Sequence, residues 1–237
     1  MSAFTRDLRA ILERDPAARN AAEVVLCYPS IWATTLHRLA HACWKHRLRL
    51  LARMISQSVR FWTGIEIHPG ATLGYGIFID HGHGVVIGET AVVGDNTTLY
   101  QGVTLGGTGK DAGKRHPTLE ENVVVGTGAK VLGPFTVGKN ARIGAGAVVL
   151  KEVPPDSTVV GNPGRVVRLG GQRVDPLDQI HMPDPVKERL DALLERTNQL
   201  EACLRQYAGG TGCERCTREG SPDCPKTREE SAEDENL

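Results

Sequence analysis

An aliphatic residue recurs every six positions through the middle of the chain. The series comprises Ile67, Leu73, Ile79, Val85, then after a two-residue slip Ile87, Val93, Leu99 and Leu105, and again Leu119, Val125, Val131, Val137, Ile143 and Val149. Six-residue repeats are typical of a parallel β-helix, in which three repeats form one triangular coil and the aliphatic side chains stack inward. Separate strands of a sandwich would alternate with a period of two, and that alternation is weak here.

The regions on either side of the repeats have helical patterns. Residues 3–62 place apolar residues three and four positions apart with basic residues between them, which predicts helices packed on their own domain rather than on a membrane. Near the other end, a short heptad series predicts a helix over 186–207: Val186, Leu190, Leu193, Thr197, Leu200 and Leu204. This helix fits either a trimeric coiled coil or a helix packed on the domain.

These patterns predict an α+β chain with five regions. They are an N-terminal helical region over 1–63, a β-helix domain over 64–169, a linker over 170–185, a helix over 186–207, and a polar, cysteine-containing, disordered tail over 208–237. The interval from Leu105 to Leu119 is fourteen residues, where two repeats would take twelve. Its polar, glycine-rich interior, residues 106–117, predicts an extruded loop of the kind that carries binding residues.

Composition narrows the function classes. The chain has 28 basic and 28 acidic side chains, which gives no net field for nucleic acid. No apolar run long enough for a membrane span or a signal peptide occurs, so we expect a cytoplasmic protein with no membrane partner. The tail cysteines Cys213, Cys216 and Cys224 lack a fourth zinc ligand, and we expect no metal.

Titratable residues gather within the repeats and in the loop. They are Glu66, His68, Asp80, His81, His83 and Glu89, followed by Lys114, Arg115 and His116. Histidine is the usual general base, and a carboxylate on its other ring nitrogen fixes the tautomer. Glu66 and His81 are fifteen residues apart, nearly one eighteen-residue circuit, so consecutive coils are expected to bring them close.

Five motifs resemble those of the serine O-acetyltransferase family, from about Arg14 to Val167. They are I65-E-I-H-P-G-A71, I79-D-H-G-H-G-V-V-I-G-E-T-A91, Q101-G-V-T-L-G-G-T-G-K110, the R-H-P triplet from Arg115 to Pro117, and G161-N-P-G-R-V-V167. The resemblance implies helices followed by a left-handed parallel β-helix. It also implies transfer of acetyl from acetyl-CoA to L-serine, the first step of cysteine synthesis from serine.

The resemblance assigns roles to individual residues. His81 matches the general base for direct transfer, and Glu66 matches its supporting acid, where the family commonly has Asp. Asp15 and Asp80 match acids that hold serine, whereas Arg115 and His116 match the pair that receives its carboxylate, with His116 orienting the substrate. The cosubstrate acetyl-CoA is expected in a groove between subunits, with contacts to Gly107, Thr127, Ala145 and Arg165.

Assembly and partners follow from the same resemblance and its departures. Familiar bacterial members carry a longer helical region before the match to Asp15, so a single homotrimer is expected here. Cysteine carries the same ammonium and carboxylate as serine, which implies feedback inhibition. Family members often end in isoleucine, which enters the active site of O-acetylserine sulfhydrylase. This chain ends in Leu237, so binding of that partner is left open.

Three other functions remain open at this point. A hexapeptide-repeat acetyltransferase for a sugar or another small alcohol explains the repeats but not the acid and Arg-His pattern. A γ-type carbonic anhydrase needs three histidines around a metal, and His81, His83 and His116 could be assigned to that role. A catalytically silent scaffold would act through its tail.

Overall fold

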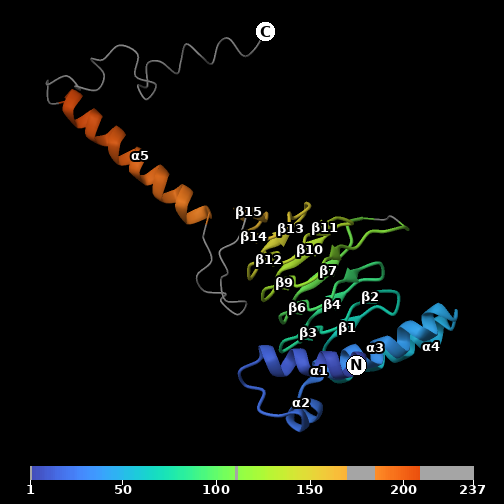
Figure 1. Ribbon diagram of the computed structural model, residues 1–237. Coiled ribbons are helices and arrows are strands. Elements are labelled where there is room, and N and C mark those ends of the chain that lie inside the picture. Colours follow the sequence, from blue (N-terminus) through green and yellow to red (C-terminus); the bar gives the residue numbers. More distant parts are fainter. Residues whose placement is uncertain (1, 110–111, 170–184, 209–237) are drawn as a thin grey trace. The chain divides into compact units, whose positions relative to one another are not determined.

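Four helices open the chain in the computed structural model, which describes residues 2–109, 112–169 and 185–208 (Figure 1). The helices are α1 (Ala3–Arg14), α2 (Ala21–Cys27), α3 (Pro29–Lys45) and α4 (Arg49–Thr63). Ser2 caps α1 by accepting a hydrogen bond from the Thr5 amide, and Gly64 ends α4 in the left-handed conformation at φ 70°. The helices predicted over residues 3–62 are confirmed.

A buried carboxylate fastens the helices to the coils. Asp7 of α1 is fully buried and pairs with Arg38 of α3 at 2.5 Å. Its Oδ1 also accepts hydrogen bonds from the amides of Gly76 and Ile77, at 2.8 and 3.2 Å. A buried charge is tolerated only when it is paired and hydrogen-bonded, so this arrangement ties α1 and α3 to the first coil.

The strands form a parallel β-helix with three faces. Face A contains β1 (Glu66–Ile67), β4 (Val86–Ile87), β7 (Thr104–Gly106), β10 (Lys130–Leu132) and β13 (Val148–Val149). Face B contains β2 (Thr72–Leu73), β5 (Val92–Val93), β8 (Thr118–Leu119) and β11 (Thr136–Val137). Face C contains β3 (Phe78–Ile79), β6 (Thr98–Leu99), β9 (Val124–Val125), β12 (Arg142–Ile143), β14 (Ser157–Val160) and β15 (Arg165–Leu169), the last antiparallel to β14. In Figure 1 the coils stack away from α1–α4.

The repeat positions fill the interior of this prism. Every aliphatic residue of the six-residue series is buried except Leu73, which is half-buried against the core. One circuit takes eighteen residues, since Val86 pairs with Thr104 and Lys130 with Val148. Burial of one aliphatic side chain per side therefore explains the six-residue period.

Two circuits are longer than eighteen residues. Glu66 pairs with Val86, twenty residues on, and Thr104 pairs with Lys130, twenty-six residues on. The extra residues lie in the turn between β3 and β4 and in the loop between β7 and β8. The loop is where the sequence predicted it. However, Leu105 and Leu119 lie on neighbouring faces, so they are separated by one six-residue repeat and not by two. Eight residues, rather than two, are therefore extra in this loop.

Helix α5 (Pro185–Ala208) lies, apart from Pro185, in a second unit, Val186–Leu237. This helix matches the one predicted over 186–207, and its heptad leucines Leu190, Leu193, Leu200 and Leu204 are exposed. The linker predicted over 170–185 lies outside the described residues except for Pro185, and the predicted tail lies outside them from residue 209 onwards. None of the described helices is long and apolar enough to cross a membrane.

Candidate active site

The turn between β3 and β4 carries His81 at the edge where faces C and A meet, hereafter edge CA. His81 has a left-handed backbone at φ 55°, and its side chain is 75% exposed. Its Nε2 lies 4.0 Å from Asp80 Oδ1. A non-glycine residue in this conformation is strained, and such strain concentrates at functional sites. The two extra residues of this turn therefore present the imidazole outward from the coil.

Two carboxylates lie near His81. Burial raises the pKa of Asp80; the charge of His81 opposes this increase, and the charge of Asp15 adds to it. Asp15 Oδ2 accepts a hydrogen bond from the Tyr28 hydroxyl at 2.6 Å, and Oδ1 accepts one from the Ala17 amide at 2.8 Å. The hydrogen bond to Asp15 raises the pKa of Tyr28 to about 12. Tyr28 was not identified from the sequence.

Glu66 lies on β1 of face A, one circuit below Val86. Within the described residues its carboxylate forms an ion pair with Arg60 of α4, at 3.1 Å, and not with His81. Glu66 and His83 line a cavity of about 510 Å³ between the end of α4 and face A. The pairing of Glu66 with His81 therefore stays a prediction.

A second cluster occupies the edge between faces A and B, hereafter edge AB. Arg115, at the end of the extruded loop, donates a hydrogen bond from Nη2 to Glu89 Oε2 at 2.5 Å. This interaction holds the pKa of Glu89 below its usual value. Lys114 donates to the backbone oxygen of Thr90 at 2.7 Å, and burial lowers its pKa. The cluster is thus a cationic site with one carboxylate built in.

His116 and His68 complete this second cluster. His116 is only 8% exposed, and its Nδ1 lies 2.9 Å from the Thr90 hydroxyl. Burial, followed by Arg115, lowers its pKa. His68 packs edge-on against Trp44 and has its pKa lowered to about 4, chiefly by burial. Both imidazoles are therefore neutral near pH 7.

The structure divides the predicted substrate residues between two edges of the prism. Asp80 and His81 lie at edge CA with Asp15 nearby, whereas Arg115 and His116 lie at edge AB. Face A separates the two groups. One chain therefore does not assemble both groups at one place.

The residues predicted for coenzyme A divide in the same way. Gly107 begins the loop at edge AB, whereas Thr127 and Ala145 lie in successive turns at edge CA. Arg165 is exposed at the start of β15. Gly107 packs against the loop, because a Cβ there would lie 3.1 Å from the Arg115 backbone oxygen.

Edge CA carries a column of left-handed glycines, Gly84, Gly102, Gly128 and Gly146. The edge between faces B and C, hereafter edge BC, uses asparagine in the same conformation at Asn96, Asn122 and Asn140. A Cβ on Gly128 or Gly146 would meet nothing within 4 Å, so nothing in the described chain excludes a side chain there. Glycine at these positions leaves room for another molecule to approach the backbone.

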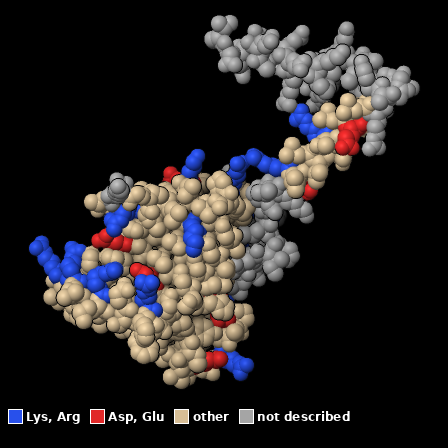
Figure 2. Space-filling model, turned by 180° about the vertical axis from the view of Figure 1, so that it is seen from behind, with Lys and Arg blue, Asp and Glu red and all other residues tan. Residues whose placement is uncertain are grey.

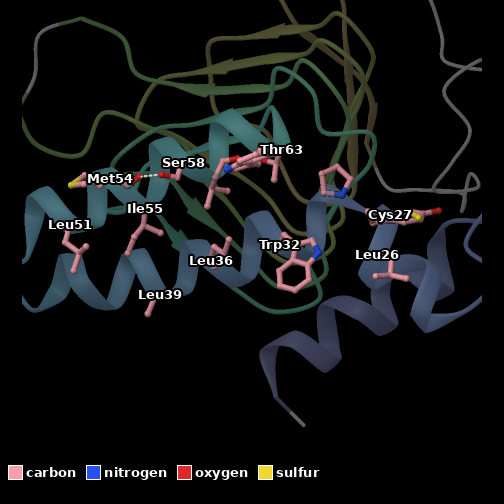
Figure 3. A pocket seen from close by; sticks show the side chains of 14 residues that line it. Leu26, Cys27, Trp32, Leu36, Leu39, Leu51, Met54, Ile55, Ser58 and Thr63 are labelled. Atoms are coloured by element: carbon pink, nitrogen blue, oxygen red, sulfur yellow. Dashed lines mark hydrogen bonds between the residues drawn. The ribbon is translucent and has the colours of Figure 1, made fainter.

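A cavity larger than the one beside Glu66 lies elsewhere. It occupies about 720 Å³ between α3 and α4 and contains none of the predicted site residues (Figure 3). Leu36, Leu39, Leu51, Met54 and Ile55 give it an apolar lining. An apolar groove without charged groups does not supply acid–base chemistry, so the two edge clusters remain the candidate site.

The histidines needed for a metal centre are also divided. His81 and His83 lie at edge CA and His116 at edge AB. Among residues 2–109, 112–169 and 185–208, no group of three or more His, Cys, Asp or Glu side chains has the arrangement of a metal site. Cys213, Cys216 and Cys224 lie outside these ranges.

Known proteins resemble the chain in both sequence and structure. Residues 116–151 match the family described as bacterial transferase hexapeptide (six repeats). A serine acetyltransferase of Synechococcus elongatus is 62% identical over 195 residues, which cover 82% of this chain and 80% of that protein.

Two solved structures extend the comparison. Soybean serine acetyltransferase complexed with serine is 46% identical, with a TM-score of 0.68, covering 70% of this chain and 68% of its own. A serine acetyltransferase in complex with cysteine is 37% identical, with a TM-score of 0.74, covering 76% of this chain and 71% of its own. The likeness confirms the predicted α+β fold with a left-handed parallel β-helix. The chain therefore belongs to the serine acetyltransferase family and is an acyltransferase of the hexapeptide-repeat type.

Proposed function

We propose that the protein transfers the acetyl group of acetyl-CoA to the hydroxyl of L-serine, giving O-acetyl-L-serine and CoA. The observation that carries this proposal is the presence of two oppositely charged groups. Asp15 and Asp80 suit an ammonium, whereas Arg115 and His116 suit a carboxylate. A sugar hydroxyl needs neither group. The serine bound to the soybean relative supports the same substrate.

His81 is the proposed general base. Its exposed imidazole takes the proton from the serine hydroxyl as that oxygen attacks the thioester carbonyl carbon. The new C–O bond forms, the C–S bond breaks, and the proton on His81 passes to the departing thiolate. A positioned base contributes about 10²- to 10⁴-fold to such a step. Glu66 is proposed to orient His81 and stabilise its charged form, which requires its carboxylate to turn from Arg60.

The two ends of serine are proposed to be held by different subunits. Edge CA of one copy supplies the acids and His81, and edge AB of a neighbouring copy supplies Arg115 and His116. Holding both ends fixes the direction of the hydroxyl, which provides the proximity contribution to catalysis. The division of both clusters between edges supports this arrangement, because repetition around a threefold axis completes three equal sites.

A homotrimer is the proposed assembly. Flat β-helix faces can pack against copies of themselves, and Figure 2 shows a broad part of the surface without acidic or basic side chains. Helix α5 adds a second contact in this proposal, because its exposed leucines repeat at heptad spacing and an isolated helix of this kind is marginal in water. Three parallel copies would bury those leucines.

Acetyl-CoA is proposed to lie between the same two edges. The glycine column at edge CA gives its pantetheine arm close access to the backbone beside Thr127 and Ala145. Gly107 of the neighbouring copy borders the same groove, and Arg165 meets a phosphate. This placement brings the thioester toward His81, which lies on the same edge.

The product places the enzyme at the first step of cysteine synthesis from serine. L-Cysteine shares the ammonium and carboxylate of serine, so it is proposed to compete at this site, and a solved relative contains cysteine. Binding of O-acetylserine sulfhydrylase through Leu237 remains a separate proposal, and that residue lies outside the described chain.

Release of CoA from acetyl-CoA tests the function. We would compare L-serine, L-homoserine and a simple sugar as acceptors, with the wild-type protein and His81→Ala. Fast release with serine alone, lost in the variant, supports both the substrate and the base. Release with a sugar alone would favour the sugar acetyltransferase. Absence of release with every acceptor would overturn the enzymatic proposal.

A further inference from the structure

The environment of His116 determines which of its ring nitrogens carries the proton. The Thr90 backbone N–H points to His116 Nδ1 at 3.2 Å, and this N–H can only donate. Nδ1 must therefore accept, and an accepting ring nitrogen carries no proton. In the neutral imidazole the proton then lies on Nε2. Within the described residues Nε2 has no hydrogen-bonding partner, so its N–H remains available to a ligand.

The Thr90 side chain reinforces this state. Its hydroxyl oxygen accepts hydrogen bonds from the backbone amides of Arg115 and His116, at 3.0 and 3.1 Å. The same hydroxyl lies 2.9 Å from His116 Nδ1 and has one proton of its own to donate. With both lone pairs occupied by amides, that proton is directed to Nδ1. One threonine therefore anchors the end of the extruded loop and the imidazole together.

Gly88 provides the space for the ring. A Cβ on Gly88 would lie 2.0 Å from His116 Cδ2 and 2.1 Å from Nε2, far inside van der Waals contact. No substitution with a side chain leaves the ring where it is. Three elements thus define one ring position: the glycine below it, the threonine at Nδ1, and the loop backbone that carries it.

We propose that Thr90 and Gly88 are positioning residues that hold His116 as a fixed neutral hydrogen-bond donor through Nε2. This inference deepens the proposed function and rests on it, since the ligand of Nε2–H is the carboxylate of the amino-acid substrate. His116 then orients serine without exchanging a proton, and the charge at this end comes from Arg115. Proton transfer is left to His81, at the other edge.

The first test observes the proton directly. The full-length protein would be labelled with 15N-histidine, and long-range 1H–15N correlations would be recorded at pH 7, with His116→Gln used to assign the signals. We expect a protonated Nε2 and an unprotonated Nδ1 for His116. A protonated Nδ1, or an average of both tautomers, would overturn the inference. This result does not depend on activity, so it is separate from the question of whether serine is the substrate.

The second test separates binding from chemistry. Thr90→Val removes the hydroxyl, and we expect the KM for serine to rise about tenfold, the loss for a hydrogen bond of ordinary strength, with kcat within about twofold. Thr90→Ser keeps the hydroxyl and should restore the KM. Thr136→Val is the matched control, because the Thr136 hydroxyl makes no hydrogen bond within the described residues.

Each outcome of the second test bears on the inference. A fall in kcat without a change in KM would make His116 a proton-transfer group and overturn the inference, as would a Thr90→Val enzyme with an unchanged KM. Failure of Thr90→Ser to rescue would also overturn it. If Thr90→Val does not fold, Thr90→Ser and the spectrum of the wild-type protein still decide the matter. If the predicted tautomer is present but no acetyl reaches serine, the proposed function fails and the assignment of the tautomer stands.

Discussion

Arg115 and Glu89 form a close ion pair at edge AB, with Nη2 2.5 Å from Oε2. Glu89 follows β4, whereas Arg115 ends the extruded loop, so the pair joins the loop to the coil. It also occupies only part of the guanidinium fork, which has five N–H donors. The remaining donors can receive a substrate carboxylate.

This pair predicts different effects for two substitutions of Glu89. Glu89→Ala releases the Arg115 side chain, and we expect the KM for serine to rise about tenfold, the order of a charge-assisted hydrogen bond. Glu89→Gln keeps an accepting oxygen and should raise the KM for serine much less. Steady-state kinetics measures both, with Glu13→Ala as the control, because Glu13 pairs with Arg9 on an exposed helix surface. An unchanged KM in Glu89→Ala would show that Arg115 needs no anchor.

Tyr28 predicts a second change in serine binding. Its hydroxyl donates to Asp15 at 2.6 Å, so Tyr28→Phe should leave the Asp15 carboxylate less well oriented. We expect the KM for serine to rise roughly 3- to 10-fold, with the KM for acetyl-CoA unchanged. Inhibition by cysteine should weaken by a similar factor, because the ammonium is shared. Tyr75→Phe, at an exposed tyrosine stacked on Arg6, is the control. If Tyr28→Phe and Tyr75→Phe had the same KM for serine, Asp15 would not belong to the serine site.

The glycine column predicts that a side chain at edge CA harms function but not folding. Asparagine adopts the left-handed conformation at Asn122, and a Cβ at Gly128 would meet nothing within 4 Å. Gly128→Asn should therefore still fold while losing acetyl-CoA affinity or trimer formation. Kinetics and mass measurement in solution test this prediction. Asn122→Gly at edge BC should affect neither property. A Gly128→Asn variant that is fully active and trimeric would show that neither acetyl-CoA nor a neighbouring copy approaches the backbone at this position of edge CA.

Buried histidines predict a loss of stability in acid. Burial lowers the pKa of His37 to about 3, and His68 contributes in the same direction with a pKa of about 4. Because these folded-state values lie below the unfolded value of 6.5, the unfolded chain binds protons first as the pH falls. Stability is therefore complete above pH 6.5 and decreases toward pH 4, where His37 alone accounts for about 3 kcal/mol.

Denaturant unfolding at pH 7 and pH 4.5, at one protein concentration, measures this effect. His37→Leu should flatten the dependence of the unfolding free energy on pH, whatever its effect at pH 7. His46→Gln, at an exposed helix end, should leave the dependence as it is in the wild type. An unchanged slope in His37→Leu would show that His37 does not couple folding to protonation.

The sequence was sufficient to predict the elements of the fold. The six-residue period arises because each side of the coil buries one aliphatic side chain. The burial of residues such as Ile87 and Val125 can therefore be predicted from their place in the repeat. The helices could be predicted equally well, since their apolar residues repeat with the helical period. The length of the circuit at the extruded loop could not be predicted. The polar interval between Leu105 and Leu119 does not reveal whether these two residues lie one or two sides of the prism apart.

The sequence also pointed to the groups that are proposed to carry the chemistry, namely His81, Asp80 and the Arg115–His116 pair. Their distribution between two edges was decided only by the tertiary structure, because it depends on which side of the prism each turn falls. Thr90 and Tyr28 were missed for the same reason. Their importance lies in hydrogen bonds to residues 26 and 13 positions away, and such contacts leave no local period in the sequence.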